Sequence, residues 1–387
     1  MSYKIKKCYL QTTKVDMRGP EQHTCTSHFK SLTWVNDPHR IGINTARSSA
    51  SKDVRAGFHL WGSMSTYKKP CLTLQQQMQL LKARGLEITD DAAAISYLGR
   101  IGYYRISAYW YSFRKTALVQ DPATKKISVQ REDDFHAGSS FKHALDLYVF
   151  DKRLRLLVLD AIERIEVAIR VDISYQLGAQ DPFAHINPTL LHGNFTKKLN
   201  SSTGKTRYQE WLDKYNQVLS RSKEDFVRHY KQKYGLPLPI WVSVELWEFG
   251  MLSMFYQGLA VVDKAAIAAK YGLPDWRVME TWLRSLNFVR NVSAHHSRLW
   301  NKNLVDQPKL PKSGDIAEFD PLVGKPDITS RVYVVLCILI YFMRRISPNS
   351  TWPARLRVLL DDFPTVPRLT LGDMGFPTDW ETHDFWK

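Results

Sequence analysis

The stretch LNFVRNVSAHHSRLWN, residues 286–301, has an apolar side and a polar side at the spacing of an α-helix. The apolar side contains Val289, Val292, His296 and Leu299. The polar side, with intervals of i, i+4, i+8 and i+11, contains Asn287, Asn291, His295 and Arg298. This pattern predicts a largely buried helix that presents a stripe of functional side chains.

Arg290 and His295 supply the chemistry that RNA cleavage needs. When the 2′-hydroxyl of RNA attacks the adjacent phosphorus, one group must take its proton and another must stabilise the anionic phosphorane. The pKa of histidine lies near working pH, and the planar fork of arginine can donate two hydrogen bonds to phosphate oxygens. We therefore take Arg290 and His295 as the candidate catalytic residues, with no metal and no cofactor required.

The positions of Asn291 and Arg290 around an ideal helix determine how each can act with His295. Asn291 shares a face with His295 and is the better candidate to orient the imidazole. Arg290 is about 140° away from His295 at ~100° per residue, so it must reach round the helix or act on the site of a partner subunit. His296 is a supporting candidate, but its place on the apolar side favours a core or interface histidine.

Several ordered blocks resemble a known family. Arg290 to His295 resembles the R-N-x3-H signature of HEPN ribonucleases, and the longer string RNVSAHHSRLWN resembles the matching block of the Abi_2 group of abortive-infection proteins (AbiD/AbiF-like). Further blocks similar to that group are YYRISAY at 103–109, LYVFDKRLR at 147–155, PIW at 239–241 and FGMLS at 249–253. The resemblance extends from about residue 68 to about residue 345.

The resemblance implies an all-α fold, a HEPN-like helical bundle with a smaller N-terminal helical domain. It also implies a homodimer in which two motifs line one cleft, and a metal-independent endoribonuclease of phage defence. Two alternatives stay open: a non-catalytic scaffold that binds RNA or a partner, and the toxin of a toxin–antitoxin pair. RNA is the expected substrate, and a regulatory non-coding RNA is a further open possibility.

Aromatic and basic residues are interleaved between residues 101 and 114. Such residues can stack on unpaired bases while they hold phosphates, although packing within a small helical domain is the more common use of such aromatics. The candidates for RNA binding are Tyr104, Arg105, Tyr109 and, from residues 286–301, Arg298.

Composition is consistent with a nucleic-acid partner. The 387 residues include 54 Lys and Arg against 38 Asp and Glu, a net charge of +16. The four cysteines contain no C-x-x-C pair, so a reducing cytoplasm fits best and a zinc site is not indicated. The apolar run at 332–343 is well short of the ~20 residues that cross a bilayer, so we expect a buried helix and no membrane partner.

The expected organisation follows from periodicity, caps and the resemblance. Residues 1–63 are an extension that is disordered or precedes the natural start at Met64, and we expect them to be dispensable. Residues 64–130 form the N-terminal helical domain, in which Thr73 and Gln76 suggest a capping box and residues 125–129 a short hairpin or loop. Residues 140–347 form the HEPN-like domain, with a surface insertion near 181–235, and 348–387 are a C-terminal tail. The core helices should start near Phe141, Trp241, Trp276 and Val332.

Overall fold

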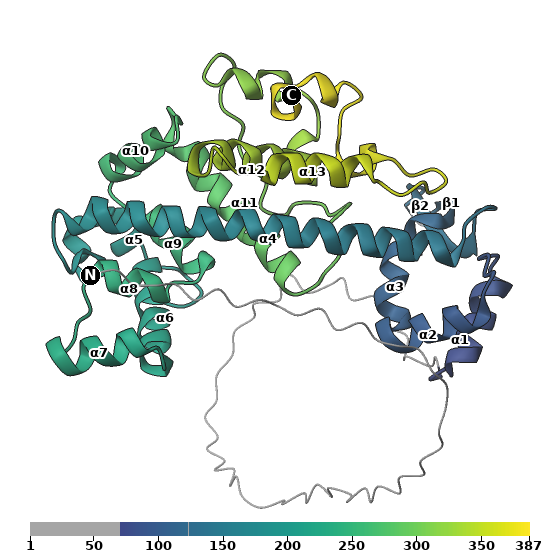
Figure 1. Cartoon of the computed structure of the whole chain (residues 1–387), viewed down its shortest axis with the longest axis horizontal. Coiled ribbons are helices and arrows are strands. Elements are labelled where there is room, and N and C mark those ends of the chain that lie inside the picture. The colour runs from purple at the N-terminus through teal and green to yellow at the C-terminus, as the bar shows by residue number, and fades with distance from the viewer. Residues whose placement is uncertain (1–69, 123) are drawn as a thin grey trace, which may run out of the picture. The chain divides into compact units, whose positions relative to one another are not determined.

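A single long helix, α4 (Phe141–Gly178), organises the structure (Figure 1). Ser140 caps it, because its hydroxyl accepts from the backbone N–H of His143 while the His143 ring accepts from Ser140. Buried residues recur along α4 from Phe141 to Leu177, and α3, α9, α11, α12 and α13 pack against it. This computed structural model describes residues 70–122 and 124–387, so the extension at 1–63 lies outside the described residues.

The N-terminal helices lie at one end of α4. They are α1 (Leu74–Ala83), α2 (Asp91–Ile101) and α3 (Tyr103–Trp110). The expected capping box of Thr73 and Gln76 opens α1, with both reciprocal hydrogen bonds formed. All of the described residues belong to one compact unit.

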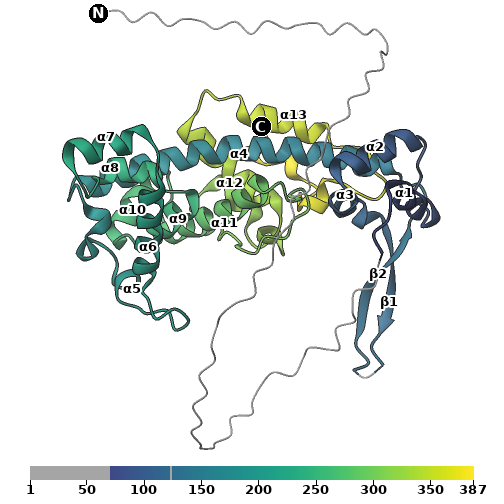
Figure 2. The ribbon, with the colours of Figure 1, turned by 90° about the horizontal axis from the view of Figure 1, so that it is seen from below.

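The expected hairpin is longer than the sequence indicated. Strands β1 (Arg114–Gln120) and β2 (Ile127–Phe135) pair antiparallel, with Leu118 opposite Val129, and extend away from the helices (Figure 2). It is the sole sheet among the described residues, and the remaining elements are helical. The all-α prediction is therefore confirmed.

The region at 181–235 is more than a surface insertion. It contains α5 (Gly193–Thr196), α6 (Arg207–Arg221) and α7 (Asp225–Tyr234). Trp211 of α6 is buried, and its ring lies 4.9 Å from that of Trp247. The polar residues of this region are mostly exposed, although His185 and Thr206 are buried, and α6 contributes an aromatic face to the core.

The remaining helices complete the core. They are α8 (Ile240–Ser243), α9 (Phe249–Gly258), α10 (Val261–Lys270), α11 (Trp276–Ala294), α12 (Val332–Ile346) and α13 (Trp352–Asp361). The starts predicted at Phe141, Trp276 and Val332 are confirmed. The helix expected from Trp241 to Ala260 is divided instead, because the chain is extended at Trp247 and Glu248.

Short 3-10 turns connect these elements. They are η1 (Tyr111–Phe113), η2 (Ala184–Ile186), η3 (Pro188–Leu190), η4 (Val244–Leu246), η5 (Ala317–Leu322), η6 (Ile328–Ser330), η7 (Leu371–Met374), η8 (Trp380–Thr382) and η9 (Asp384–Trp386).

The last 40 residues, expected as a tail, are folded onto the core. Trp352 is fully buried and its Nε1 donates to the carbonyl of Leu157 on α4 at 2.8 Å. Phe376, Trp380 and Phe385 are buried as well. None of the helices in the described part of the chain is long and apolar enough to cross a membrane.

Candidate functional site

Helix α11 ends at Ala294, immediately before the candidate histidines. The N–H of His296 donates to the carbonyl of Ser293 at 3.1 Å, and the N–H of Ser297 donates to that of Val292 at 2.9 Å. These two hydrogen bonds form the Schellman arrangement that ends many helices. Its left-handed position, usually glycine, is occupied by His296 with φ of 57°.

This helix end corrects the sequence interpretation. The helical spacing predicts a stripe that continues through His296 to Leu299, and residues 294–301 contain no glycine or proline to mark a stop. In the structure His295 is the C-cap and His296 follows it, so neither lies on a helix face. Both are exposed, and His296 is therefore not a core histidine.

The turn after α11 and helix α3 form the walls of a groove of about 630 Å³. Six of the eight candidate residues from the sequence line this groove. They are Tyr104, Arg105, Tyr109, His295, His296 and Arg298. Tertiary structure thus brings the aromatic-basic segment and the histidine pair together from positions about 190 residues apart, as the hydrogen bond from Arg105 to His296 shows directly.

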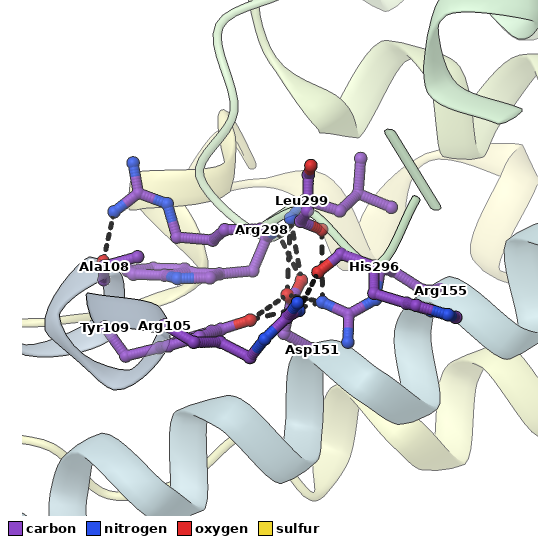
Figure 3. Close-up of polar contacts among 10 residues, drawn as sticks. Arg105, Ala108, Tyr109, Asp151, Arg155, His296, Arg298 and Leu299 are labelled. Carbon is purple, nitrogen blue, oxygen red and sulfur yellow. Dashed lines mark hydrogen bonds and ion pairs between the residues drawn. The ribbon is translucent and has the colours of Figure 1, made fainter. Parts of the chain in front are cut away.

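Two arginines connect the walls of the groove, and each donates a hydrogen bond to a backbone carbonyl of the opposite wall (Figure 3). Arg105 Nη1 on α3 donates to the carbonyl oxygen of His296 at 2.8 Å. Arg298 Nη1 on the turn donates to the carbonyl oxygen of Ala108 on α3. Burial lowers the pKa of Arg298 below its usual value. Each segment thus places a guanidinium on the backbone of the other.

Asp151 of α4 lies beneath the groove and is fully buried, with 0 % of its surface exposed. Its Oδ2 accepts from the Tyr109 hydroxyl at 2.7 Å and from Arg155 Nη1. Its Oδ1 accepts from the backbone N–H of Leu299 at 3.1 Å and of Trp300 at 2.7 Å. Burial raises the pKa of the Asp151 carboxyl, and the Arg155 charge, the Tyr109 hydroxyl and the two amides oppose that rise.

Neither Asp151 nor Arg155 is among the site residues predicted from the sequence. A signal was present, because both charged residues fall among the apolar positions of the stripe that contains Leu147, Leu154 and Val158. A charged pair at i, i+4 inside an apolar face must be hydrogen-bonded when it is buried, and therefore marks a specific contact.

The structure separates the candidates for RNA stacking. Tyr104 is 91 % exposed. Tyr109 is only 2 % exposed, and its ring packs edge-on against Tyr148 at 5.4 Å. The ring of Tyr109 is therefore not available to a base, and the expectation that it stacks on RNA is corrected: it bonds Asp151 instead.

Arg290 and Asn291 do not line the groove. Arg290 Nη1 donates to Asn291 Oδ1 at 3.3 Å. Among the described residues no hydrogen bond joins the Asn291 side chain to the His295 imidazole. The expected Asn291–His295 contact is thus replaced by a contact between Asn291 and Arg290.

Glu166 of α4 lies close enough to Arg290 to be affected by its charge. Burial raises the pKa of the Glu166 carboxyl, while Arg170 and then Arg290 lower it. Glu166 forms an ion pair with Arg170, which also donates to the carbonyl of Trp247 at 2.6 Å. Arg290 is therefore part of a second charged cluster, separate from the groove.

In residues 70–122 and 124–387, no group of three or more His, Cys, Asp or Glu side chains is arranged to hold a metal ion. Cys71 is exposed and Cys337 is buried, and both are free thiols.

Comparison with known proteins gives one match. The family described as Abi-like protein matches residues 96–301, more than half of the chain. No curated protein and no solved structure matches. The matched region contains every candidate residue and the Asp151 network. The chain therefore belongs to the family of Abi-like proteins, and this membership supports a role in phage defence by abortive infection.

Proposed function

We propose that this Abi-like protein is a metal-independent endoribonuclease of the HEPN type that acts in abortive infection. The observation that carries the proposal is the pair of exposed imidazoles, His295 and His296, at a groove that Arg105, Arg298 and Tyr104 also line. Imidazoles transfer protons near neutral pH, and guanidinium groups attract phosphate. The net charge of +16 favours a polyanionic substrate.

The proposed reaction needs no external nucleophile. The 2′-oxygen of the RNA attacks phosphorus, and an imidazole, which we assign to His295, takes its proton. The bond from phosphorus to the 5′-oxygen then breaks, and that oxygen takes a proton from a second acid. The products are a 2′,3′-cyclic phosphate and a 5′-hydroxyl, and Arg290 stabilises the phosphorane between the two steps.

Arg290 lies outside the groove of its own subunit, and this position favours a site shared between two subunits. We propose a homodimer in which Arg290 and Asn291 of one subunit complete the groove of the other. Tyr104, with its ring almost fully exposed, is the residue we expect to stack on an unpaired base.

The first experiment tests the chemistry. Purified protein is incubated with cellular RNA in EDTA, and the product ends are identified. His295→Ala should lower cleavage by about 10²–10⁴-fold, because a positioned acid–base group contributes that much. His229→Ala, which removes an exposed histidine on α7 outside the groove, is the matched control and should cleave normally.

A second experiment tests the shared site. Arg290→Ala and His295→Ala are each prepared, then mixed under conditions that exchange subunits. In a mixed dimer one of the two shared sites keeps both residues, so the mixture should recover up to about a quarter of the normal activity. No recovery, or an active monomer in light scattering, would place Arg290 and His295 in one subunit.

The binding-scaffold alternative has its own signature. If cleavage requires a divalent ion, or persists in both His295→Ala and Arg290→Ala, the protein is better described as a scaffold that binds RNA or a protein partner. RNA that copurifies equally with the wild type and His295→Ala, without any cleavage, would support the same conclusion.

A further inference from the structure

Three sequence blocks that lie far apart in the chain meet at one buried carboxylate. Tyr109 comes from YYRISAY on α3, Asp151 and Arg155 come from LYVFDKRLR on α4, and Leu299 follows the turn after α11. We propose that Asp151 is the positioning residue that fixes the conformation of the His295–His296 turn. The functional consequence rests on the proposed cleavage reaction, in which this turn carries the acid–base group.

The hydrogen bonds of Asp151 leave the turn little freedom. A carboxylate accepts through two oxygens, and here four different donors occupy them: one hydroxyl, one guanidinium and two consecutive backbone amides. Two adjacent amides that point to the same carboxylate define the backbone direction at Leu299 and Trp300. Arg155 extends this control, because its Nη1 also donates to the carbonyl of Ser297 at 3.2 Å.

The turn is therefore held on both sides of His296. On the helix side, the Schellman hydrogen bonds connect His296 and Ser297 back to α11. On the far side, Asp151 holds Leu299 and Trp300. His296 lies between them in a left-handed conformation that is uncommon for a residue with a side chain. A backbone of this kind persists where the surrounding contacts determine it.

The same hydrogen bonds also hold α3, the opposite wall of the groove, in position. The Tyr109 hydroxyl donates to Asp151. Arg105 on α3 donates to a carbonyl of the turn, and Arg298 on the turn donates to a carbonyl of α3 (Figure 3). The separation of Tyr104 from the two histidines thus depends on a carboxylate that does not itself face the groove. Desolvation of both charges offsets much of the attraction in a buried ion pair, so we assign this pair a role in fixing the conformation of the turn.

Tyr109→Phe is the sharpest variant, because it removes one hydroxyl from the network and retains the ring. The chain offers a matched control in Tyr271→Phe. The Tyr271 hydroxyl donates to Asp172, also on α4, at 2.6 Å, and Tyr271 is buried but does not line the groove. Both variants therefore remove a tyrosine–aspartate hydrogen bond from the same helix.

Two measurements are made on the full-length protein. Hydrogen–deuterium exchange reports the amides of Leu299 and Trp300 whether or not RNA is cleaved. RNA cleavage in EDTA gives kcat and KM. Tyr109→Phe should speed exchange of these two amides by about tenfold or more and lower kcat by about tenfold, with KM little changed. Tyr271→Phe should change neither.

Each outcome is decisive. Unchanged exchange at Leu299 and Trp300 in Tyr109→Phe overturns the proposal, and faster exchange with unchanged kcat overturns the positioning role. Equal effects of Tyr271→Phe would indicate a general loss of stability and also overturn it. If the wild type cleaves no RNA, the proposed function fails together with the catalytic consequence, while exchange still decides whether Asp151 fixes the turn.

A second variant covers loss of folding. If Tyr109→Phe melts much earlier than Tyr271→Phe, Arg155→Lys replaces it, because lysine keeps the positive charge but lacks the planar fork that reaches both Asp151 and Ser297. The expected result is the same faster exchange and lower kcat, and unchanged values for both would overturn the proposal.

Discussion

Helix α4 carries three carboxylate–arginine pairs at i, i+4, and two of them, Asp151–Arg155 and Glu166–Arg170, differ in burial and in what they hold. Asp151 and Arg155 are 0 % and 5 % exposed at their side chains, and they hold the turn after α11. Glu166 and Arg170 are 14 % and 17 % exposed, and Arg170 holds the break before α9 through the carbonyl of Trp247. Each pair stabilises an irregular backbone segment on a neighbouring part of the chain.

The difference shows how one helix can support a rigid site and a more open one. Four donors saturate Asp151, so its surroundings have one arrangement. Glu166 is partly exposed and is affected by Arg290 as well as by Arg170. The first pair therefore suits the positioning of a turn within the chain. The second suits a surface that a partner or substrate can complete.

The largest expected effect is the loss of the saturated carboxylate. Asp151→Ala leaves the Arg155 charge buried without its partner and two backbone amides without an acceptor. Such a change should lower the free energy of unfolding by about 3–5 kcal/mol, measured by urea denaturation. A loss below about 1 kcal/mol would mean that water replaces the carboxylate and that the two pairs are not different in kind.

Acid should destabilise the region of the second pair through His185. This histidine is fully buried beside Trp247, with ring centroids 6.1 Å apart, and burial lowers its pKa to about 4. As pH falls below about 6.5, the His185 imidazole is protonated in the unfolded chain, whereas in the folded protein it stays neutral until about pH 4. The free energy of unfolding should therefore be highest above pH 6.5 and fall by up to about 3 kcal/mol as the pH is lowered from 6.5 to about 4.

The control for the acid effect is His185→Phe, which cannot titrate. Urea denaturation at pH 7 and pH 4.5 should show a smaller difference for this variant than for the wild type. If both lose the same free energy between these pH values, other groups cause the acid sensitivity.

Removing the more open carboxylate should have a smaller effect. In Glu166→Ala, Arg170 retains its hydrogen bond to the carbonyl of Trp247 and its ion pair with Glu245, in which the charged atoms are 3.6 Å apart. The free energy of unfolding should fall by about 1 kcal/mol, near the upper value for exposed ion pairs. A loss equal to that of Asp151→Ala would remove the distinction between the pairs.

The smallest expected effect is a gain of stability at the turn. His296→Gly places glycine at the left-handed position of the Schellman arrangement, where a side chain is unfavourable. The melting temperature should rise slightly, corresponding to at most about 1 kcal/mol, whereas His296→Ala should give no such rise. A destabilised His296→Gly would show that the imidazole itself makes a stabilising contact.

The parts of the fold that sequence reasoning predicted are those that local rules determine. Ser140 and the capping box at Thr73 and Gln76 mark helix starts, and the apolar run from Val332 matches a buried helix that is covered on all sides. The break at Trp247 was not predicted, because its support is an arginine on α4 that is 77 residues away. Local patterns carry no information about such a distant partner.

The candidate site divides in the same way. Histidine, arginine and tyrosine in particular blocks identified the chemistry, and six of those residues do line one groove. Their accessibility could not be read from spacing: Tyr104 and Tyr109 belong to the same aromatic segment, yet one is exposed and the other buried. The roles of Arg290 and His295 in cleavage remain predictions for the experiments above.

The sequence by itself determined the helical class, the main helix starts and the residue types available for phosphate and proton chemistry, because caps and periodicity act over a few neighbouring residues. Tertiary structure alone decided where α11 stops and which way the chain turns at His296. That decision depends on Asp151, whose carboxylate accepts the amide of Leu299 across 148 residues of sequence. A buried charge needs all of its partners at once, and only the folded chain brings them together.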